Sequence, residues 1–203
     1  DEDRRIDINN IFSLNRIGVS NTVESGQSLT IGAHYKKSRT DYKKSRTDYK
    51  NFRTDYKNFR TDYKKSREED NFPKDVLELS LATVFRDEIN EKMPNSSSLG
   101  NKSSDVVGHM KIVPNNFFNT SYNFAVDNNV DQFKYHYITA QFKVNNFVTS
   151  FKYVEEKDNI GNEHYLQNTT SYTFNENSSI SFSTRRNKKI DLTEYYDLIY
   201  QYK

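Results

Sequence analysis

The stretch "QFKYHYITAQFKVNNFVTSFKYV", residues 132–154, contains two segments of alternating character joined by Asn145 and Asn146. Alternation with a period of two, in residues rich in Tyr, Phe, Thr and Val, is typical of β-strands. Asn tolerates the left-handed backbone of a tight turn. The stretch therefore predicts a β-hairpin.

The same period-two pattern continues on both sides of this hairpin, which predicts an all-β chain of about nine antiparallel strands in a meander. The other strand segments are "QSLTIGAHY" (27–35), "DVLELSLATVF" (75–85), "NTSYNFAV" (119–126), "YLQNTTSYTF" (165–174), "SISFSTRR" (179–186) and "LTEYYDLIYQY" (192–202).

The predicted connections alternate between short and long. The links at 113–116, 144–147 and 174–178 are short and rich in Asn, whereas 86–104 and 155–163 are longer and charged. Transmembrane β-barrels have short periplasmic turns at one end and longer extracellular loops at the other. Long strands with a dense set of Tyr and Phe fit such a wall, and closure would remove exposed strand edges. We therefore expect part of a transmembrane β-barrel.

The composition excludes several classes of protein. The chain has no Cys, so it has neither a disulfide framework nor a zinc–thiolate site, and its four His are far apart. No apolar run of about 18 residues is present, so no transmembrane helix is predicted. There is no nucleophile motif and no glycine-rich phosphate loop. We expect no enzymatic activity and no cofactor.

A tandem repeat interrupts the strand pattern. From Tyr35 to Glu69 the sequence repeats every seven residues, and "KKSRTDY" and "KNFRTDY" each occur twice. The second apolar position of the heptad is Phe in two copies but Ser in three, which is too polar for a coiled-coil seam. An odd period also makes successive Tyr change faces in a strand. We interpret residues 36–70 as a tandem expansion inside a connector; a marginal helix or spike is the alternative.

The basic charge of the chain is confined to this repeat. Residues 35–69 carry 13 Lys and Arg against 6 Asp and Glu, whereas the other residues carry 17 against 22. A nucleic-acid arm would therefore depend on the repeat alone, and we expect no nucleic-acid partner. The basic pairs Arg185-Arg186 and Lys188-Lys189 could contact phosphates, or could be an ordinary charged hairpin end.

The first 35 residues contain the most specific motif. The stretch "NNIFSLNRIGVSNTVESGQSLTIGAHY" (9–35) resembles the signature of the outer-membrane LPS-assembly family, LptD or organic solvent tolerance protein. A second stretch, "VFRDEINEKMPNSSSLGNKSSDVVGHM" (84–110), resembles a later loop of that family. The matching residues taken as site candidates are Asn10, Phe12, Ser13, Leu14, Arg16, Glu24 and Gly26 in the first loop, and Pro94, Ser98, Leu99, Ser104, Asp105 and Gly108 in the second.

The resemblance implies a C-terminal fragment of the family's barrel. Residues 1–35 would be an extracellular loop folded toward the lumen followed by the first strand, 36–70 a periplasmic repeat insertion, and 71–203 further barrel strands. The family's periplasmic domain, its late Cys and both sides of its exit gate would be absent.

The implied function is lipopolysaccharide transport and insertion at the outer membrane of a Gram-negative bacterium. The implied partners are lipopolysaccharide, membrane lipid, the plug lipoprotein LptE and the periplasmic bridge protein LptA. Two alternatives stay open: another outer-membrane barrel, porin-like or autotransporter-type, and a soluble β-sandwich binding module with a basic arm.

Overall fold

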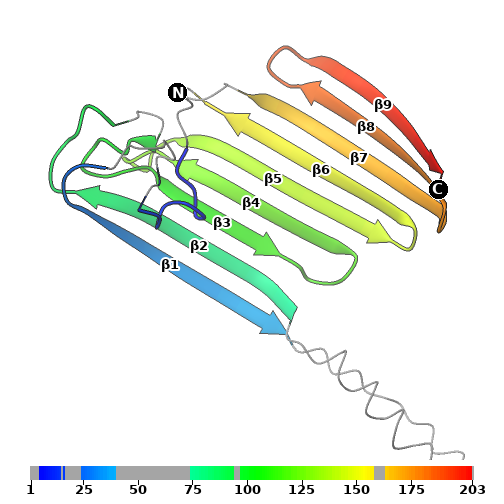
Figure 1. Cartoon of the computed structure of the whole chain (residues 1–203), viewed down its shortest axis with the longest axis horizontal. Coiled ribbons are helices and arrows are strands. Elements are labelled where there is room, and N and C mark those ends of the chain that lie inside the picture. The colour runs from blue at the N-terminus through cyan, green and yellow to red at the C-terminus, as the bar shows by residue number, and fades with distance from the viewer. Residues whose placement is uncertain are drawn as a thin grey trace, which may run out of the picture.

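Nine strands form one antiparallel sheet in the computed structural model, which describes residues 5–14, 16, 24–39, 74–93, 97–157 and 163–202. The strands lie side by side in chain order (Figure 1). Their bounds are β1 Ser28–Arg39, β2 Lys74–Arg86, β3 Val106–Ile112, β4 Phe118–Val126, β5 Phe133–Val144, β6 Phe147–Glu156, β7 His164–Asn175, β8 Ser178–Asn187 and β9 Leu192–Tyr202. The predicted all-β meander of nine strands is confirmed.

The two ends of the sheet differ as the sequence predicts. Residues 145–146 and 176–177 join β5 to β6 and β7 to β8 as two-residue turns. Asn145 adopts a φ of 50°, the left-handed conformation that such a turn needs. Longer connections, such as 87–105 between β2 and β3, lie at the opposite end. We refer to these as the short-turn end and the long-loop end.

The strand pairing separates the side chains into two faces of opposite character. Leu79 pairs with Met110, Met110 with Tyr122, and Tyr122 with Ile138, so these residues share one face. Because side chains alternate, the residues between them share the other face. The large hydrophobic residues of the first face, here named the apolar face, include Leu29, Ile31, Tyr35, Leu79, Leu81, Phe85, Phe124, Ile138, Phe142, Phe147, Phe151, Leu166, Tyr172, Phe182, Tyr196, Leu198, Tyr200 and Tyr202.

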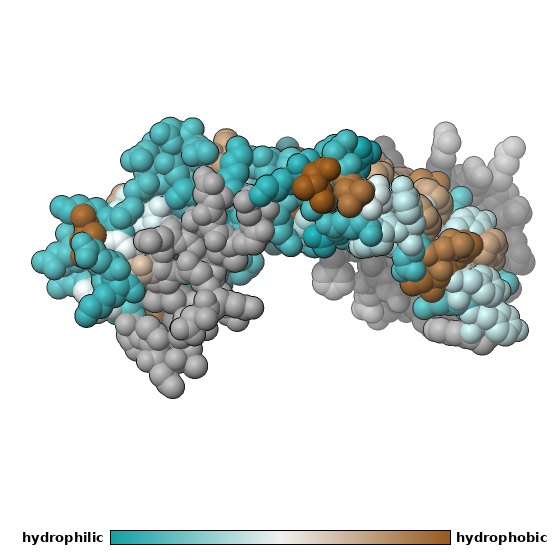
Figure 2. All heavy atoms as spheres, turned by 90° about the horizontal axis from the view of Figure 1, so that it is seen from above, coloured by the Kyte–Doolittle hydropathy of each residue, from teal (hydrophilic) through white to brown (hydrophobic). Residues whose placement is uncertain are grey.

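The apolar face is the exposed one. Leu81 is 48% exposed, Leu198 is 67% exposed and Tyr202 is 75% exposed, and nearly every exposed large hydrophobic residue of the strands lies on this face. Hydrophobic residues are visible at the surface beside hydrophilic ones in Figure 2. The exceptions are on β9, where Leu192, Tyr195 and Ile199 fall on the other side.

The hydrophobic core lies on the opposite, polar face. There Ile6, Ile11 and Leu99 pack on a pad of small residues from β2, β3 and β4: Ala82, Val84, Val107 and Ala125. The N-terminal segment, dark blue in Figure 1, crosses the long-loop end of these strands. The rest of the polar face carries Ser, Thr, Asn, Gln, Lys and Tyr, with hydrogen-bonded pairs such as Ser121 and Thr139.

A β-bulge at Lys134 alters one predicted face. Simple alternation places Phe133 beside Tyr135, Tyr137 and Thr139. In the structure Val126 pairs with Phe133 while Ala125 pairs with Tyr135, so one extra residue shifts the register. Phe133 therefore moves to the apolar face, where its ring contacts those of Phe124 and His136.

The predicted repeat insertion, residues 36–70, lies largely outside the described residues. Its first residues extend β1, which ends at Arg39 and pairs there with Lys74 at the start of β2. The interpretation of the repeat as an expanded connector stays a prediction. No helix in the described part of the chain is long and apolar enough to cross a membrane.

Engineered disulfides test the register of the sheet, because the chain has no Cys of its own. Thr169 and Ser183 are direct partners on β7 and β8. We expect the double variant Thr169→Cys, Ser183→Cys to oxidise readily, since directly paired Cβ atoms lie about 4.5–5.5 Å apart.

The control pair is Thr169→Cys with Ser181→Cys, a diagonal pair separated by about 7–8 Å that should stay largely reduced. Thiol alkylation and mass spectrometry measure both. Preferential oxidation of the diagonal pair would contradict the register.

Candidate functional site

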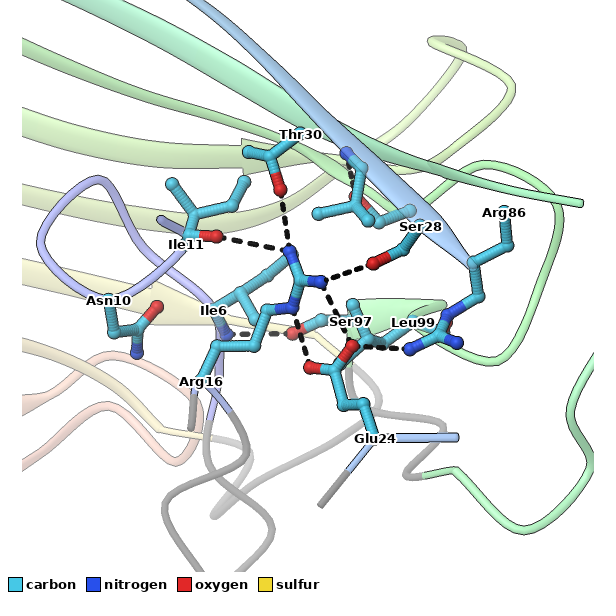
Figure 3. Close-up of polar contacts among 12 residues, drawn as sticks. Ile6, Asn10, Ile11, Arg16, Glu24, Ser28, Thr30, Arg86, Ser97 and Leu99 are labelled. Carbon is cyan, nitrogen blue, oxygen red and sulfur yellow. Dashed lines mark hydrogen bonds and ion pairs between the residues drawn. The ribbon is translucent and has the colours of Figure 1, made fainter. Parts of the chain in front are cut away.

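The two signature loops meet at the long-loop end, on the polar side of the sheet. Arg16 and Glu24 come from the first loop, whereas Ser97 and Leu99 come from the second (Figure 3). The junction between them is Arg86, the last residue of β2. Segments separated by more than 60 residues in sequence are therefore joined in one site.

Arg16 is the centre of this site. Its Nε donates to Glu24 Oε1 over 2.5 Å and its Nη2 to Glu24 Oε2 over 2.9 Å, a bidentate pair. Its remaining contacts are with Ile11 O, Thr30 Oγ1 and Ser28 Oγ, at 3.1, 2.7 and 2.9 Å. The guanidinium thereby attaches the loop to the start of β1.

Glu24 holds a second guanidinium as well. Arg86 pairs with Glu24 Oε2 and also donates to Leu99 O over 2.8 Å and Ser25 O over 2.9 Å. The side chains of Arg16, Glu24 and Arg86 are 8%, 9% and 2% exposed. One buried carboxylate thus compensates two buried cations, whose other N–H groups are satisfied by carbonyl and hydroxyl oxygens.

The apolar part of the junction depends on the small residues of the polar face. Ile11 is fully buried and Ile6 is 1% exposed. The sheet leaves room for these two side chains because it presents Ala82 and Ala125 there rather than long side chains. The N–H of Ile6 donates to Ser97 Oγ over 2.9 Å, so the two loops are also linked by a hydrogen bond.

Asn10 shapes the turn that delivers Ile11 to this core. Its amide accepts from the N–H of Asp7 over 2.8 Å and donates to Arg5 O over 3.1 Å. Asp7 Oδ1 in turn accepts from the N–H of Asn9 and of Asn10. This is the local side-chain to backbone bonding that makes Asx residues favourable in turns.

The second loop is anchored by Ser104 and Asp105. Ser104 Oγ accepts from the N–H of Val84 and donates to Asp105 O, both over 2.9 Å. Asp105 is fully buried, and its Oδ1 accepts from Lys134 Nζ over 2.9 Å. Lys134 also donates to Ser98 Oγ over 3.0 Å. The bulge that displaces Phe133 therefore places a cation against the buried carboxylate.

The structure explains why two of the signature positions are occupied by glycine. A Cβ on Gly108 would lie 2.1 Å from Cζ of Phe124, so the Phe124 ring covers the glycine directly. Gly26 adopts a φ of +86°, which disfavours other residues.

The remaining residues of the two signatures differ in their exposure and contacts. Phe12 is 62% exposed, with its ring over Gly32, and Leu14 is 96% exposed. The N–H of Ser13 donates to Asn10 O over 2.8 Å. Pro94 lies outside the described residues. Leu14 is thus almost fully exposed, whereas Phe12 covers Gly32 with its ring and keeps its outer side exposed.

Sequence reasoning missed several residues that complete the site. Arg86 stands inside the second motif but was not singled out, and Ile6, Ser97, Lys134 and Glu156 lie outside the quoted matches. Arg5 pairs with Glu156 across 151 positions of sequence and lies over the ring of Tyr135 at 4.8 Å. Arg86 could have been found from the sequence, because it is an Arg at the end of a strand and the neighbouring loop contains a Glu. The other missed residues join the site only through tertiary packing.

The chemistry of the site is that of an anchor. In the described ranges no group of three or more His, Asp or Glu side chains could hold a metal ion. The charged groups pair with one another, and the loops are attached to the polar face at several independent points.

Replacing the central carboxylate tests this anchor. Glu24→Gln leaves two buried guanidinium groups without a counter-charge, so we expect a loss of about 3–5 kcal/mol in the free energy of unfolding. The control is Glu88→Gln at an exposed loop position, which should change stability by less than about 0.5 kcal/mol. Denaturant titration in detergent measures both; similar effects for the two variants would contradict the anchor.

The loop between β4 and β5 contains a coupled pair of carboxyl groups. Burial acts to raise the pKa of Asp127, but the N–H groups of Gln132 and Asp131 hold it below its ordinary value. The pKa of Asp131 is raised because its carboxyl group hydrogen-bonds to that of Asp127 and meets its negative charge.

The pH dependence of this loop follows from these directions. The depressed pKa of Asp127 stabilises the folded loop above the ordinary Asp pKa, and this contribution is lost as pH falls through the lowered value. For Asp131 the sign is opposite, because its raised pKa favours the folded loop only while the group is protonated.

We expect ¹³C NMR titration of the two carboxyl groups to give a lower pKa for Asp127 than for Asp131. Asp131→Asn, which keeps a donor toward Asp127 without the charge, should weaken the pH dependence of amide exchange in this loop. The reverse order of the two pKa values would contradict the hydrogen-bond arrangement.

Comparison with known proteins identifies no family for this chain. No protein-family model matches this sequence, and no curated protein matches it. The likeness to the LPS-assembly family therefore rests on the two quoted motifs, which the structure brings together at one end of the sheet.

Proposed function

We propose that this chain forms part of the wall of an outer-membrane β-barrel that helps to place lipopolysaccharide in the outer leaflet. The observation that carries the proposal is the inversion of the sheet. Its large apolar side chains are exposed, while its polar face holds the packed loops and the buried ion pairs.

An exposed apolar face of this size is unfavourable in water. Leaving a Leu or Phe side chain exposed forgoes about 1.5–3 kcal/mol of burial free energy. Exposed apolar patches on water-soluble monomers seldom exceed a few hundred Å², and larger ones mark contact with a membrane or a partner. Lipid hydrocarbon satisfies such a face without a second protein layer.

The aromatic residues favour the membrane over a protein partner. Near the short-turn end, the rings of Phe118 and Phe142 lie 4.7 Å apart, and those of Tyr172 and Phe174 lie 5.1 Å apart. Near the long-loop end, Tyr153 contacts His164 at 5.7 Å between ring centroids. Aromatic girdles at both boundaries of an apolar band are typical of barrel walls.

The lipopolysaccharide part of the proposal is supported by the signature loops. Their resemblance to the LPS-assembly family implies a loop folded toward the lumen, and the loops here lie on the polar face. By the same resemblance, the partners would be the plug lipoprotein LptE and the bridge protein LptA. The role of this chain would be passive: it lines the path, and the energy for transport comes from elsewhere.

Two alternatives differ in what they require. A porin-like or autotransporter-type barrel would share the inverted sheet but not the likeness of the loops. A soluble β-sandwich would need a second sheet on the apolar face, whereas the described residues form one sheet whose packed segments lie on the polar face.

Fractionation and depletion together test the proposal. We expect the full-length protein in the outer-membrane fraction, and we expect depletion to lower surface lipopolysaccharide as measured by surface labelling. A porin of unrelated function serves as the depletion control. Recovery in the soluble fraction would contradict the membrane assignment, and normal surface lipopolysaccharide after depletion would favour another barrel.

A further inference from the structure

One row of directly paired residues crosses the polar face from β1 to β6 near the long-loop end. Its members are Gly32, Ala82, Val107, Ala125, Tyr135 and Glu156. The first four have no side chain larger than that of Val, whereas the last two have long ones. Because neighbouring strands lie about 4.8 Å apart, the row spans roughly 24 Å. The small side chains leave space for a chain segment to lie flat on the sheet.

The N-terminal segment, dark blue in Figure 1, lies along this row. At the β1 end, the ring of Phe12 lies over Gly32. Over β2, β3 and β4, Ile6 and Ile11 pack against the small side chains of the row. We name residues 5–11 the strap, because they cross the sheet perpendicular to its strands.

At its β6 end the strap is held by one charged side chain. Arg5 pairs with Glu156 and lies over the ring of Tyr135, 4.8 Å from its centroid. The side chains of Arg5 and Glu156 are each 11% exposed, and the buried Nη1 of Arg5 has no hydrogen-bond partner among the described residues. A buried donor without a partner is unfavourable. The attachment at β6 is therefore incompletely satisfied.

The other end of the strap meets a fully bonded anchor. The guanidinium of Arg16 donates to five oxygen atoms, one of which is Ile11 O at the end of the strap. Within the strap, the side chains of Asp7 and Asn10 bond to backbone groups and hold its turn together. The strap can therefore move as one unit, released at Arg5 and retained at Ile11.

We propose that the strap is a gate that closes the polar face at the long-loop end and opens when the pair of Arg5 and Glu156 breaks. The inference rests on the proposed function, in which the polar face lines a water-filled passage. In the closed state the strap covers the small residues of the row, such as Ala125, which is 1% exposed. Opening exposes this row to water, while Arg16 keeps the strap attached to β1.

Thiol labelling at position 125 measures opening directly, because the chain has no Cys of its own. Ala125→Cys places a thiol beneath the strap, so a water-soluble maleimide should label it slowly in the full chain in detergent micelles. Adding Glu156→Gln removes the charge that holds Arg5. We expect labelling to become at least about tenfold faster, because removing one partner of a buried ion pair destabilises the contact strongly.

Two further variants in the Ala125→Cys background are the controls. Glu163→Gln removes the same charge beside Glu156, but Glu163 faces Arg185 at 3.7 Å rather than the strap, so labelling should change less than about twofold. The exchange of Arg5→Glu with Glu156→Arg restores an ion pair and should return labelling to the slow rate. Equal rates with and without Glu156→Gln, or no slowing by the exchange, would overturn the gate.

A position farther along the same face tests whether the strap limits access. Thr139 lies on the polar face of β5, closer to the short-turn end than Tyr135. In intact cells that contain the full-length protein, a bulky maleimide added outside should label Thr139→Cys faster when Glu156→Gln is also present. Faster labelling at position 125 without faster labelling at position 139 would show a strap that moves without gating, and would overturn the proposal.

The outcome is separable from that of the proposed function. Fractionation and surface lipopolysaccharide do not depend on the strap, and labelling of position 125 in micelles does not depend on location or transport. Circular dichroism verifies the β-sheet of each variant. If Glu156→Gln unfolds the protein, Arg5→Gln replaces it, with the same expected rise in labelling and the same contradiction if the rate is unchanged.

Discussion

The rest of the structure depends on one constraint: the exposed apolar face of the sheet is unfavourable in water and needs other surroundings. The chain places its loops, ion pairs and small core on the polar face and leaves Leu, Phe and Tyr outside. In water this arrangement would be the wrong way round, because burial of apolar surface is the main favourable contribution to folding. The proposed membrane setting would reverse this balance, because lipid hydrocarbon satisfies an exposed apolar face.

The loop junction follows from the same constraint. A polar face cannot hold a segment by hydrophobic burial alone, so the junction combines a few small residues, such as Ala82 and Ala125, with buried charges. Glu24 compensates Arg16 and Arg86, and Asp105 compensates Lys134. Buried ion pairs add little stability relative to an apolar substitute but are costly to break singly. They therefore fix the position of the loops rather than raise the stability of the sheet.

The strand order and the two faces could be predicted from sequence because both are local properties. Period-two alternation marks the strands, and Asn145 marks a turn. The face of Phe133 could not be predicted, since nothing in the local pattern marks the bulge at Lys134, whose side chain contacts Asp105, a residue distant in sequence. The motif residues Arg16, Glu24 and Leu99 were selected by resemblance, but their convergence on Arg86 depends on tertiary packing. The exposed Phe12 and Leu14 have no part in that packing.

The most direct measurement of the central claim is spin-label accessibility on adjacent residues of β5 in reconstituted bilayers. Ile138 and Thr139 lie on opposite faces of the sheet, and single Cys variants can be labelled because the chain has no native Cys. The account predicts that a label at 138 is relaxed mainly by oxygen, which concentrates in lipid, and a label at 139 mainly by a water-soluble nickel complex. Equal access of both labels to the nickel complex, or the reverse pattern, would contradict a wall with lipid on its apolar side.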